Sequence, residues 1–310
     1  MTFGQRRSGQ MNLQGACMEQ AATIRKVGVV GLGNMGSGMA RSLMRAGYQV
    51  AGFDPSPAAC AALQADGAAI AASAAELAGQ VELLILSLPT SDVVEAVVLA
   101  PAGVLEGARR GLLVVDTTTA DPNSTRKVAA ATAECGLRFI DGPVSGGPKG
   151  AATGTMTMAL GGDAADVAAA MPVLEAISAK RVHVGPVGAG HVTKLLNNLM
   201  CGAHLLVAGE AARIAREAGL DAQQIFDGIN AGSGRSGVTQ VNYPTWVFNE
   251  AFNSGFTMKL MRKDIRLAMG LLKELSVDAP LSAEAGRLWA HSADSIADGE
   301  DFNRIVQLGE

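Results

Sequence analysis

The chain has 310 residues, more than one hydrophobic core usually serves, so two domains are expected. Hydrophobic residues make up 48% of it and charged residues 17%, which predicts a folded rather than a disordered protein. The net charge is −4 without a basic run, and no apolar run reaches the roughly 18 residues of a membrane span. We therefore expect neither nucleic acid nor a membrane as a partner.

Two features bear on the compartment in which the protein works. Residues 1–25 are polar and lack the apolar stretch of a secretory signal, so we expect a flexible N-terminal tail. The four cysteines are far apart and form no CxxC pair, which argues against a zinc site and against a disulfide framework. The expectation is a cytoplasmic protein with reduced thiols.

From Lys26 onward, short apolar runs alternate with helical stretches. Strands are predicted at residues 27–30, 48–53, 81–87, 112–116, 138–141, 156–160 and 181–184, and helices at 35–46, 58–65, 123–135 and 163–178. Such alternation is typical of βαβ units and predicts an α/β fold with a mainly parallel sheet.

The strand signals stop after residue 190. Residues 192–218 have helical apolar spacing and predict one long helix that ends at Gly219, and further helices are predicted after it. We therefore expect an α/β domain at residues 26–187. An all-α domain for substrate binding and oligomerisation is expected at residues 188–310, entered through the long helix between the domains.

A glycine loop separates the first predicted strand from the first predicted helix. It consists of Gly31, Leu32, Gly33, Asn34, Met35 and Gly36. In such a GxGxxG segment the first glycine permits a tight turn, the second lets the backbone approach a pyrophosphate, and the third lets helix and strand pack closely. The helix start adds unpaired N–H groups that attract phosphate. The loop predicts a Rossmann domain that binds NAD or NADP; a glycine turn kept for packing is the alternative.

An acid, Asp54, ends the second predicted strand. It stands about 20 residues after the glycine loop, where NAD enzymes place an acid that accepts the adenosine ribose hydroxyls. A carboxylate there would repel the 2′-phosphate of NADP, so NAD is favoured as the cofactor. Because Pro55 and Pro57 follow, a turn or capping role for Asp54 is the alternative.

Residues 141–150 follow the C-terminal end of a predicted strand, the edge at which open α/β sheets bind ligands. Ser145 and the backbone N–H groups of Gly146 and Gly147 can bind a carboxylate. These three residues are candidates for holding the acid group of a substrate. A tight turn without a chemical role is the alternative.

The start of the long predicted helix carries Lys194 and Asn198, which are four residues apart and share one helical face. A lysine partly buried among apolar neighbours has a lowered pKa and can exchange a proton with a hydroxyl or carbonyl oxygen. Asn198 can donate a hydrogen bond to the same oxygen. A surface lysine whose stem covers apolar side chains is the alternative.

Four motifs occur in the order found in the β-hydroxyacid dehydrogenase family, which the chain resembles over about residues 26–307. They are VGVVGLGNMGSGMA (27–40), DGPVSGGPKGAATGT (141–155), GPVGAGHVTKLLNN (185–198) and MRKDIRLA (261–268). The family includes 3-hydroxyisobutyrate dehydrogenase, tartronate semialdehyde reductase and threonate dehydrogenase. The resemblance implies NAD(P)-dependent interconversion of a small 3-hydroxy acid and its semialdehyde, without a metal. It also implies a homodimer or a homotetramer.

The resemblance implies a role for each residue of the substrate site. Lys194 is implied to be the catalytic lysine, and Asn198 is implied to assist it. The substrate carboxylate is implied to rest on Ser145, Gly146 and Gly147.

Further residues are implied to meet the cofactor. Lys263 corresponds to the family's second active-site lysine, which closes over nicotinamide and substrate. Leu88, Pro89 and Thr118 resemble family positions that touch the cofactor. His191 stands beside the catalytic lysine in the sequence, and we expect it to support the site rather than to touch the substrate.

The segment before Lys263 is expected to shape the far end of the pocket. Arg235, Thr239 and Gln240 are polar enough to bind a substrate hydroxyl or a second acid group. An ordinary loop between helices is the alternative.

Other functions remain open beside the dehydrogenase. An imine reductase-like enzyme shares the architecture but generally lacks the catalytic lysine, and a 6-phosphogluconate dehydrogenase needs a much larger helical domain. A non-catalytic NAD(P)-binding or interaction protein on the same fold would also depart at the lysine. Lys194 therefore favours the dehydrogenase among these functions.

Overall fold

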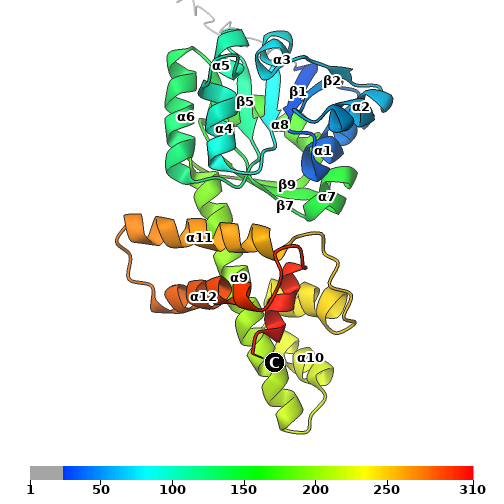
Figure 1. Ribbon diagram of the computed structural model, residues 1–310, viewed down its shortest axis with the longest axis vertical. Helices are drawn as coiled ribbons and strands as arrows, with labels where there is room; N and C mark the ends of the chain where they lie inside the picture. The colour runs from blue at the N-terminus through cyan, green and yellow to red at the C-terminus, as the bar shows by residue number, and fades with distance from the viewer. Residues whose placement is uncertain (1–23, 310) are drawn as a thin grey trace, which may run out of the picture.

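A computed structural model describes residues 24–309. The expected N-terminal tail, residues 1–25, falls almost wholly on residues 1–23, which lie outside the described part. A sheet-containing part is followed by a helical part, and one long helix, α9 (Ala189–Glu217), runs from the first into the second (Figure 1). The predicted fold class, a mainly parallel Rossmann-like sheet followed by helices, is confirmed.

The described residues form one sheet. Its strands are β1 (Lys26–Val30), β2 (Gln49–Phe53), β3 (Ala69–Ile70), β4 (Leu83–Leu86), β5 (Leu113–Asp116), β6 (Arg138–Asp141), β7 (Val144–Ser145), β8 (Met156–Gly161) and β9 (Ser178–Gly185). The order is β3-β2-β1-β4-β5-β6-β8-β7, and β9 pairs with β8. The first six strands of this order are parallel, whereas β8 is antiparallel to β6 and β7. The carboxyl ends of β1, β4, β5 and β6 therefore lie along one edge, where a ligand is expected.

Helices cover both faces of the sheet. They are α1 (Asn34–Arg45), α2 (Pro57–Ala65), α3 (Ala74–Gln80), α4 (Ser91–Leu99), α5 (Val104–Gly107), α6 (Pro122–Glu134), α7 (Gly147–Thr153) and α8 (Ala164–Ile177). One buried apolar cluster lies under α1, α2, α7 and α8, and a second lies under α3, α4, α5 and α6. Because neither face meets water, the central strands β4 and β5 are buried apolar runs rather than alternating ones.

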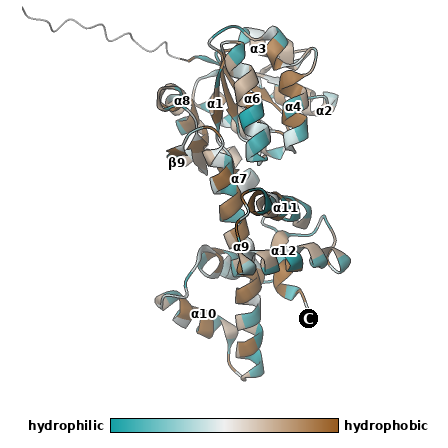
Figure 2. Ribbon diagram, turned by 90° about the vertical axis from the view of Figure 1, so that its left-hand side faces the viewer, coloured by the Kyte–Doolittle hydropathy of each residue, from teal (hydrophilic) through white to brown (hydrophobic). Residues whose placement is uncertain are grey.

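The helical part is built around α9. Its other elements are α10 (Ala222–Ala231), the π-helix η1 (Val238–Val247), α11 (Met258–Glu274), α12 (Pro280–His291) and the 3₁₀ turns η2 (Ser292–Asp294) and η3 (Phe302–Gln307). A third buried cluster joins Leu195 and Leu205 of α9 to Ile265 and Trp289. Figure 2 shows α9 as the axis beside which α10, α11 and α12 lie. Among residues 24–309, no helix has both the length and the apolar character needed to cross a bilayer.

Several boundaries differ from the prediction. Helix α9 begins at Ala189 instead of residue 192, because Gly188 makes a left-handed turn with φ 91° directly before it. Strand β9 extends beyond the predicted residues 181–184 at both ends. The substrate segment at residues 141–150 contains β7 and the start of α7, with a glycine turn between them.

Some elements escaped prediction altogether. They are β3, α3, α4, α5, β7, α7 and the π-helix η1. In α4, whose sequence is SDVVEAVVL, branched valines favour strand by intrinsic preference. The Thr90 side chain accepts a hydrogen bond from Val93 N and caps the helix, and Val94 and Val98 are buried against the sheet. Capping and burial therefore outweigh the intrinsic preference of the valines.

Candidate active site

The glycine loop between β1 and α1 is shaped as a pyrophosphate cradle. Gly31 has φ 90°, and a Cβ there would lie 2.2 Å from Ser87 O. A Cβ at Gly36 would lie 1.8 Å from Gly31 O, so both positions need glycine for packing. At Gly33, by contrast, a Cβ would meet no described atom within 4 Å. Gly33 is also the N-cap of α1 and has no side chain to bond the first N–H groups. The open backbone and the uncapped helix start fit a dinucleotide phosphate.

Asp54 lies at the carboxyl end of β2 and is tied to this loop. Its Oδ2 accepts a hydrogen bond from Leu32 N at 2.7 Å, and its Oδ1 accepts one from Ser56 N at 2.8 Å. The turn role considered for Asp54 is therefore present in the structure. Each carboxylate oxygen has a second lone pair, so a ribose hydroxyl can bind the same side chain.

The loops after β4 and β5 meet at the same edge of the sheet. Leu88 N donates a hydrogen bond to Thr118 Oγ1 at 3.1 Å, and Thr118 N donates one to Asp116 Oδ1 at 3.0 Å. Leu88, Pro89 and Thr118 are thus brought beside one another, 30 residues apart in the chain. Residues that are distant in sequence form one wall next to the glycine loop.

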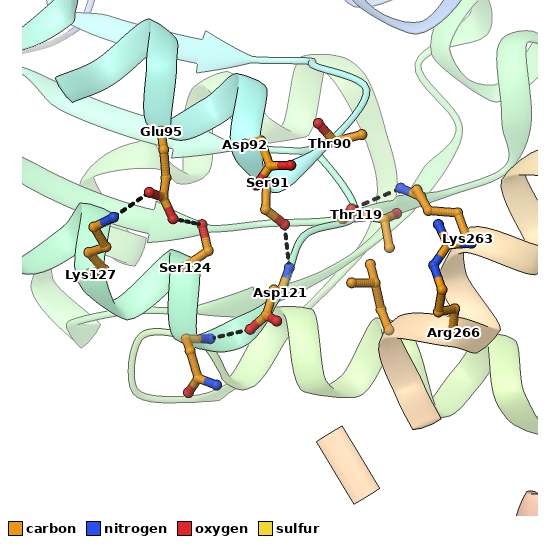
Figure 3. A pocket seen from close by; sticks show the side chains of 12 residues that line it. Thr90, Ser91, Asp92, Glu95, Thr119, Asp121, Ser124, Lys127, Lys263 and Arg266 are labelled. Atoms are coloured by element: carbon orange, nitrogen blue, oxygen red, sulfur yellow. Dashed lines mark hydrogen bonds and ion pairs between the residues drawn. The ribbon is translucent and has the colours of Figure 1, made fainter. Parts of the chain in front are cut away.

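Lys263 reaches this wall from helix α11 (Figure 3). Its Nζ donates to Thr119 O at 2.9 Å and lies 3.4 Å from Pro89 O. The same amino group lies 3.2 Å from Asp264 Oδ1. The structure therefore joins the predicted cofactor positions Pro89 and Lys263, and it adds Thr119, which the sequence analysis did not single out.

A cleft opens beside Lys263, between the starts of α4 and α6 and helix α11 (Figure 3). Its wall is polar and includes Thr90, Ser91 and Arg266. The acidic and basic side chains that line it are equal in number, and Glu95 among them is paired with Lys127. The cleft therefore carries both signs of charge, and α11 contributes Lys263 and Arg266 to one wall.

Lys194 lies on α9, where that helix leaves the sheet. Its Nζ donates a hydrogen bond to Ser145 Oγ at 3.0 Å, so two of the predicted site residues are in contact. Desolvation lowers the pKa of Lys194 below its usual value and the nearby charge of Lys263 lowers it further, while Asp264 and Cys201 oppose this shift. The side chain is partly buried, which differs from the surface lysine considered as an alternative.

Asn198 follows Lys194 by one helical turn and is buried. Its Nδ2 donates to Asp264 Oδ2 at 2.6 Å, and its Oδ1 accepts from Asn197 Nδ2 at 3.0 Å. Asp264 was missed in the sequence analysis, although the Lys–Asp pair in MRKDIRLA marks it. Because α11 packs on α9, the hydrogen bond between Asn198 and Asp264 joins the helix that carries Lys194 to the helix that carries Lys263.

Ser145, Gly146 and Gly147 lie where β7 passes into α7. Gly146 and Gly147 have φ of 124° and 61°, conformations that favour glycine. This turn places Ser145 Oγ at the amino group of Lys194.

His191 is buried completely and faces the sheet part. Its ring nitrogens lie 2.7 Å from Thr125 Oγ1 and 2.7 Å from Thr118 O. It therefore contacts the loop that carries Thr118, in the supporting position expected of it.

The residues expected at the far end of the pocket bond within their own segment. Arg235 Nη1 donates to Gly232 O at 3.1 Å, and Thr239 Oγ1 accepts from Ser236 N at 2.9 Å. Gln240 is exposed. These contacts do not join them to Lys194 or Ser145, and their binding of a substrate group stays a prediction.

The chain matches two family models. Residues 26–185 match the NAD binding domain of 6-phosphogluconate dehydrogenase. Residues 188–309 match a model described as the NAD-binding domain of NADP-dependent 3-hydroxyisobutyrate dehydrogenase.

Individual proteins are similar over nearly the whole chain. A probable 3-hydroxyisobutyrate dehydrogenase of Mycobacterium tuberculosis is 36% identical over 286 residues, which cover 90% of this chain and 96% of that protein. The 2-(hydroxymethyl)glutarate dehydrogenase of Eubacterium barkeri is 34% identical, with 92% and 95% of the two chains covered. The solved structure of Mycobacterium tuberculosis 3-hydroxyisobutyrate dehydrogenase with L-serine superposes with a TM-score of 0.86 at 35% identity, covering 92% of this chain and 98% of that one.

Proposed function

The chain belongs to the β-hydroxyacid dehydrogenase family, and on that premise we propose that it interconverts a small 3-hydroxy acid and its semialdehyde, with Lys194 as general acid and base. It is an NAD(P)-dependent oxidoreductase of hydroxy acids. The observation that carries the proposal is the contact between Lys194 Nζ and Ser145 Oγ. It places a partly buried amine of lowered pKa beside a group that can hold the substrate.

The cofactor lies along the carboxyl edge of the sheet in this proposal. The pyrophosphate rests on the glycine loop, Gly31–Gly36, and the adenosine ribose meets Asp54. Leu88, Pro89 and Thr118 would line the next stretch of the cofactor, and Lys263 would lie at its nicotinamide end. NAD is the preferred cofactor, because the Asp54 carboxylate repels a 2′-phosphate. When bound, the cofactor accepts or supplies the hydride.

The substrate lies between the two parts of the chain. Its carboxylate rests on Ser145, Gly146 and Gly147. In the oxidation Lys194 takes the proton of the C3 hydroxyl, and in the reduction it returns that proton to the carbonyl oxygen. Asn198 is held by Asp264 and donates to the same substrate oxygen from its other amide hydrogen. Contacts to both the carboxylate and the reacting oxygen would fix the orientation of the substrate for hydride transfer.

The organisation of the chain is also part of the proposal. It comprises a dinucleotide-binding domain at residues 26–187 and a substrate and oligomerisation domain at residues 188–310. A homodimer or homotetramer is supported by exposed apolar side chains along α9, which are Leu196, Met200, Val207 and Ile214. A cytoplasmic location is supported by three free thiols among the described residues.

The substrate is proposed to resemble 3-hydroxyisobutyrate. Two alternatives are a non-catalytic NAD(P)-binding protein on this fold and an imine reductase-like enzyme. Neither requires an amine at Lys194 that is desolvated and bonded to a serine.

Nicotinamide absorbance with a panel of acids tests the function. The panel holds 3-hydroxyisobutyrate, glycerate, threonate, 4-hydroxybutyrate, sulfolactate and L-serine, each with NAD and with NADP. We expect turnover with at least one 3-hydroxy acid, and its loss in Lys194→Ala. Cofactor binding without turnover on any acid would favour the binding protein, and turnover of a cyclic imine alone would favour the imine reductase.

A further inference from the structure

The first turn of α9 is capped from another part of the chain. Its N-cap residue, Gly188, has no side chain to accept the free N–H groups of the turn. The carboxylate of Asp141, at the end of β6, takes this place. Its Oδ1 accepts from Gly188 N at 2.7 Å and its Oδ2 accepts from His191 N at 2.8 Å. Asp141 is completely buried, so this cap is a fixed internal contact and not a surface one.

Two glycines leave room for this contact and for little else. A Cβ at Gly161 would lie 2.4 Å from Asp141 Oδ1. A Cβ at Gly190 would lie 2.8 Å from Asp141 Oδ2 and 2.5 Å from Ala159 O. Because the backbone packs this closely against the carboxylate at both glycines, there is little room for the helix start to shift toward Asp141 or Ala159.

The side chain of His191 anchors the same turn at a second place. The carbonyl oxygen of Thr118 only accepts, so His191 Nε2 donates to it at 2.7 Å. Nδ1 then accepts from the Thr125 hydroxyl, also at 2.7 Å. Burial lowers the pKa of His191 to about 4, so the ring is neutral near neutral pH and this arrangement holds. The backbone N–H of His191 is thus fixed by Asp141, and its ring is fixed by Thr118 and Thr125.

These anchors determine where the Lys194 side chain emerges. His191 and Lys194 are three residues apart, less than one helical turn. The segment that supplies Asp141 also supplies Ser145, whose hydroxyl meets Lys194 Nζ at 3.0 Å. One short segment, residues 141–145, therefore holds both the start of the helix and the amino group of the lysine.

We propose that Asp141 and His191 are positioning residues for Lys194, which fix the first turn of α9 so that the amino group arrives at Ser145 and the substrate oxygen. The inference rests on the proposed role of Lys194 in the reaction. Neither residue touches the substrate. A small rotation or shift of the turn displaces the amino group, and misplacement by about 1 Å can cost about a hundredfold in rate.

The first variant is Asp141→Asn, which keeps the size of the side chain but offers an NH₂ where an acceptor is needed. We expect kcat to fall by about tenfold to a hundredfold, while KM for substrate and Kd for NAD stay within about twofold. Asp221→Asn is the matched control, because Asp221 caps α10 by accepting from Gln224 N at 2.9 Å and lies outside the site. It should leave kcat near the wild-type value. Equal KM and kcat in Asp141→Asn and wild type would overturn the proposal.

A double-mutant cycle separates positioning from general damage. If Asp141 acts through Lys194, Asp141→Asn causes no further loss of kcat in a Lys194→Ala enzyme. Losses that multiply would overturn the positioning role and leave the role of Lys194 intact. Normal turnover in Lys194→Ala alone would overturn both. Should Asp141→Asn fail to fold, Thr125→Val tests the same coupling, because it removes the hydroxyl that lies 2.7 Å from His191 Nδ1 and 2.9 Å from Asp121 O. A folded Thr125→Val enzyme with wild-type kcat would then contradict the proposal.

Discussion

Lys263 on α11 donates a hydrogen bond of 2.9 Å to the carbonyl oxygen of Thr119, which follows β5 of the sheet. The contact spans 144 residues of chain and joins the helical part to the edge where the cofactor positions lie. It places the positive charge of Lys263 close enough to lower the pKa of Lys194. The two lysines are therefore coupled, although only one is proposed to move a proton.

This coupling predicts a shift in pH dependence. Lys263→Met removes a positive charge near Lys194, so protonation of Lys194 becomes easier and its pKa rises. The acid limb of the kcat/KM profile for oxidation should move to higher pH, apart from any loss of rate. Lys263→Arg keeps the charge and should leave the limb in place. An unchanged limb in Lys263→Met would show that the charges do not interact.

The glycine loop predicts two different outcomes for two alanine variants. A Cβ at Gly33 meets no described atom within 4 Å, whereas a Cβ at Gly36 would lie 1.8 Å from Gly31 O. Gly33→Ala should therefore melt at the wild-type temperature but bind NAD more weakly, because the methyl group stands where the pyrophosphate approaches. Gly36→Ala should lower both the melting temperature and the affinity for NAD. Thermal melting with and without NAD distinguishes them, and normal NAD binding by Gly33→Ala would remove the loop from the cofactor site.

Asp54 predicts the choice of cofactor. In the wild type Leu32 N donates a 2.7 Å hydrogen bond to the Asp54 carboxylate. Asp54→Asn keeps an oxygen that can accept this bond but removes the negative charge. We expect kcat/KM with NADP to rise relative to NAD. Asp54→Ala also loses the support of the loop and should weaken NAD by about 1–3 kcal/mol in kcat/KM. Wild-type protein that prefers NADP would contradict the role given to Asp54.

Much of the sheet part was predictable because its signals are local. β1, the glycine loop and α1 follow one another within about 20 residues, and each is marked by apolar runs or glycines. The helices α4 and α7 were not predictable, since the valines of α4 favour strand and α7 depends on a glycine turn. What selects these helices is burial against elements distant in sequence.

The site residues likewise divide into those that the local sequence predicts and those that depend on contacts between distant elements. Lys194 and Asn198 were expected on one helical face from their spacing alone, but the contact of Lys194 with Ser145 spans 49 residues and follows only from the fold. Asp264 and the cap by Asp141 were not expected, because each bonds a partner on another element, over 66 and 50 residues. Such contacts depend on strand order and helix packing, which no local pattern encodes.

A buried carboxyl group predicts how stability varies with pH. Asp116 is completely buried at the end of β5, and desolvation raises its pKa from 3.8 to about 7. The native state then holds a proton that the unfolded state has lost, so the contribution of Asp116 to stability falls as pH rises from about 4 to about 7.

The Asp116→Asn variant isolates this effect. Asn keeps the oxygen that accepts from Thr118 N but cannot ionise. Urea unfolding at pH 5 and pH 8 should show the variant gaining stability relative to wild type at the higher pH. Because the charge of Asp141 contributes to the raised pKa of Asp116, the difference between the two proteins reports Asp116 together with its effect on Asp141. A difference that does not change with pH would contradict the raised pKa.

The measurement that bears most directly on the account is kcat/KM for oxidation against pH, in wild type, Lys194→Ala and Lys194→Arg. General acid–base groups contribute about 10²–10⁴ in rate, so Lys194→Ala should lose at least that order while NAD binding and melting stay unchanged. Lys194→Arg should not recover the rate, because a guanidinium keeps its proton near neutral pH. In wild type the rate should fall on the acid side as Lys194 is protonated, and this limb should be absent from the residual activity of the variants. Near-normal turnover in both variants, with the acid limb preserved, would contradict the assignment of Lys194 as the acid and base of this site.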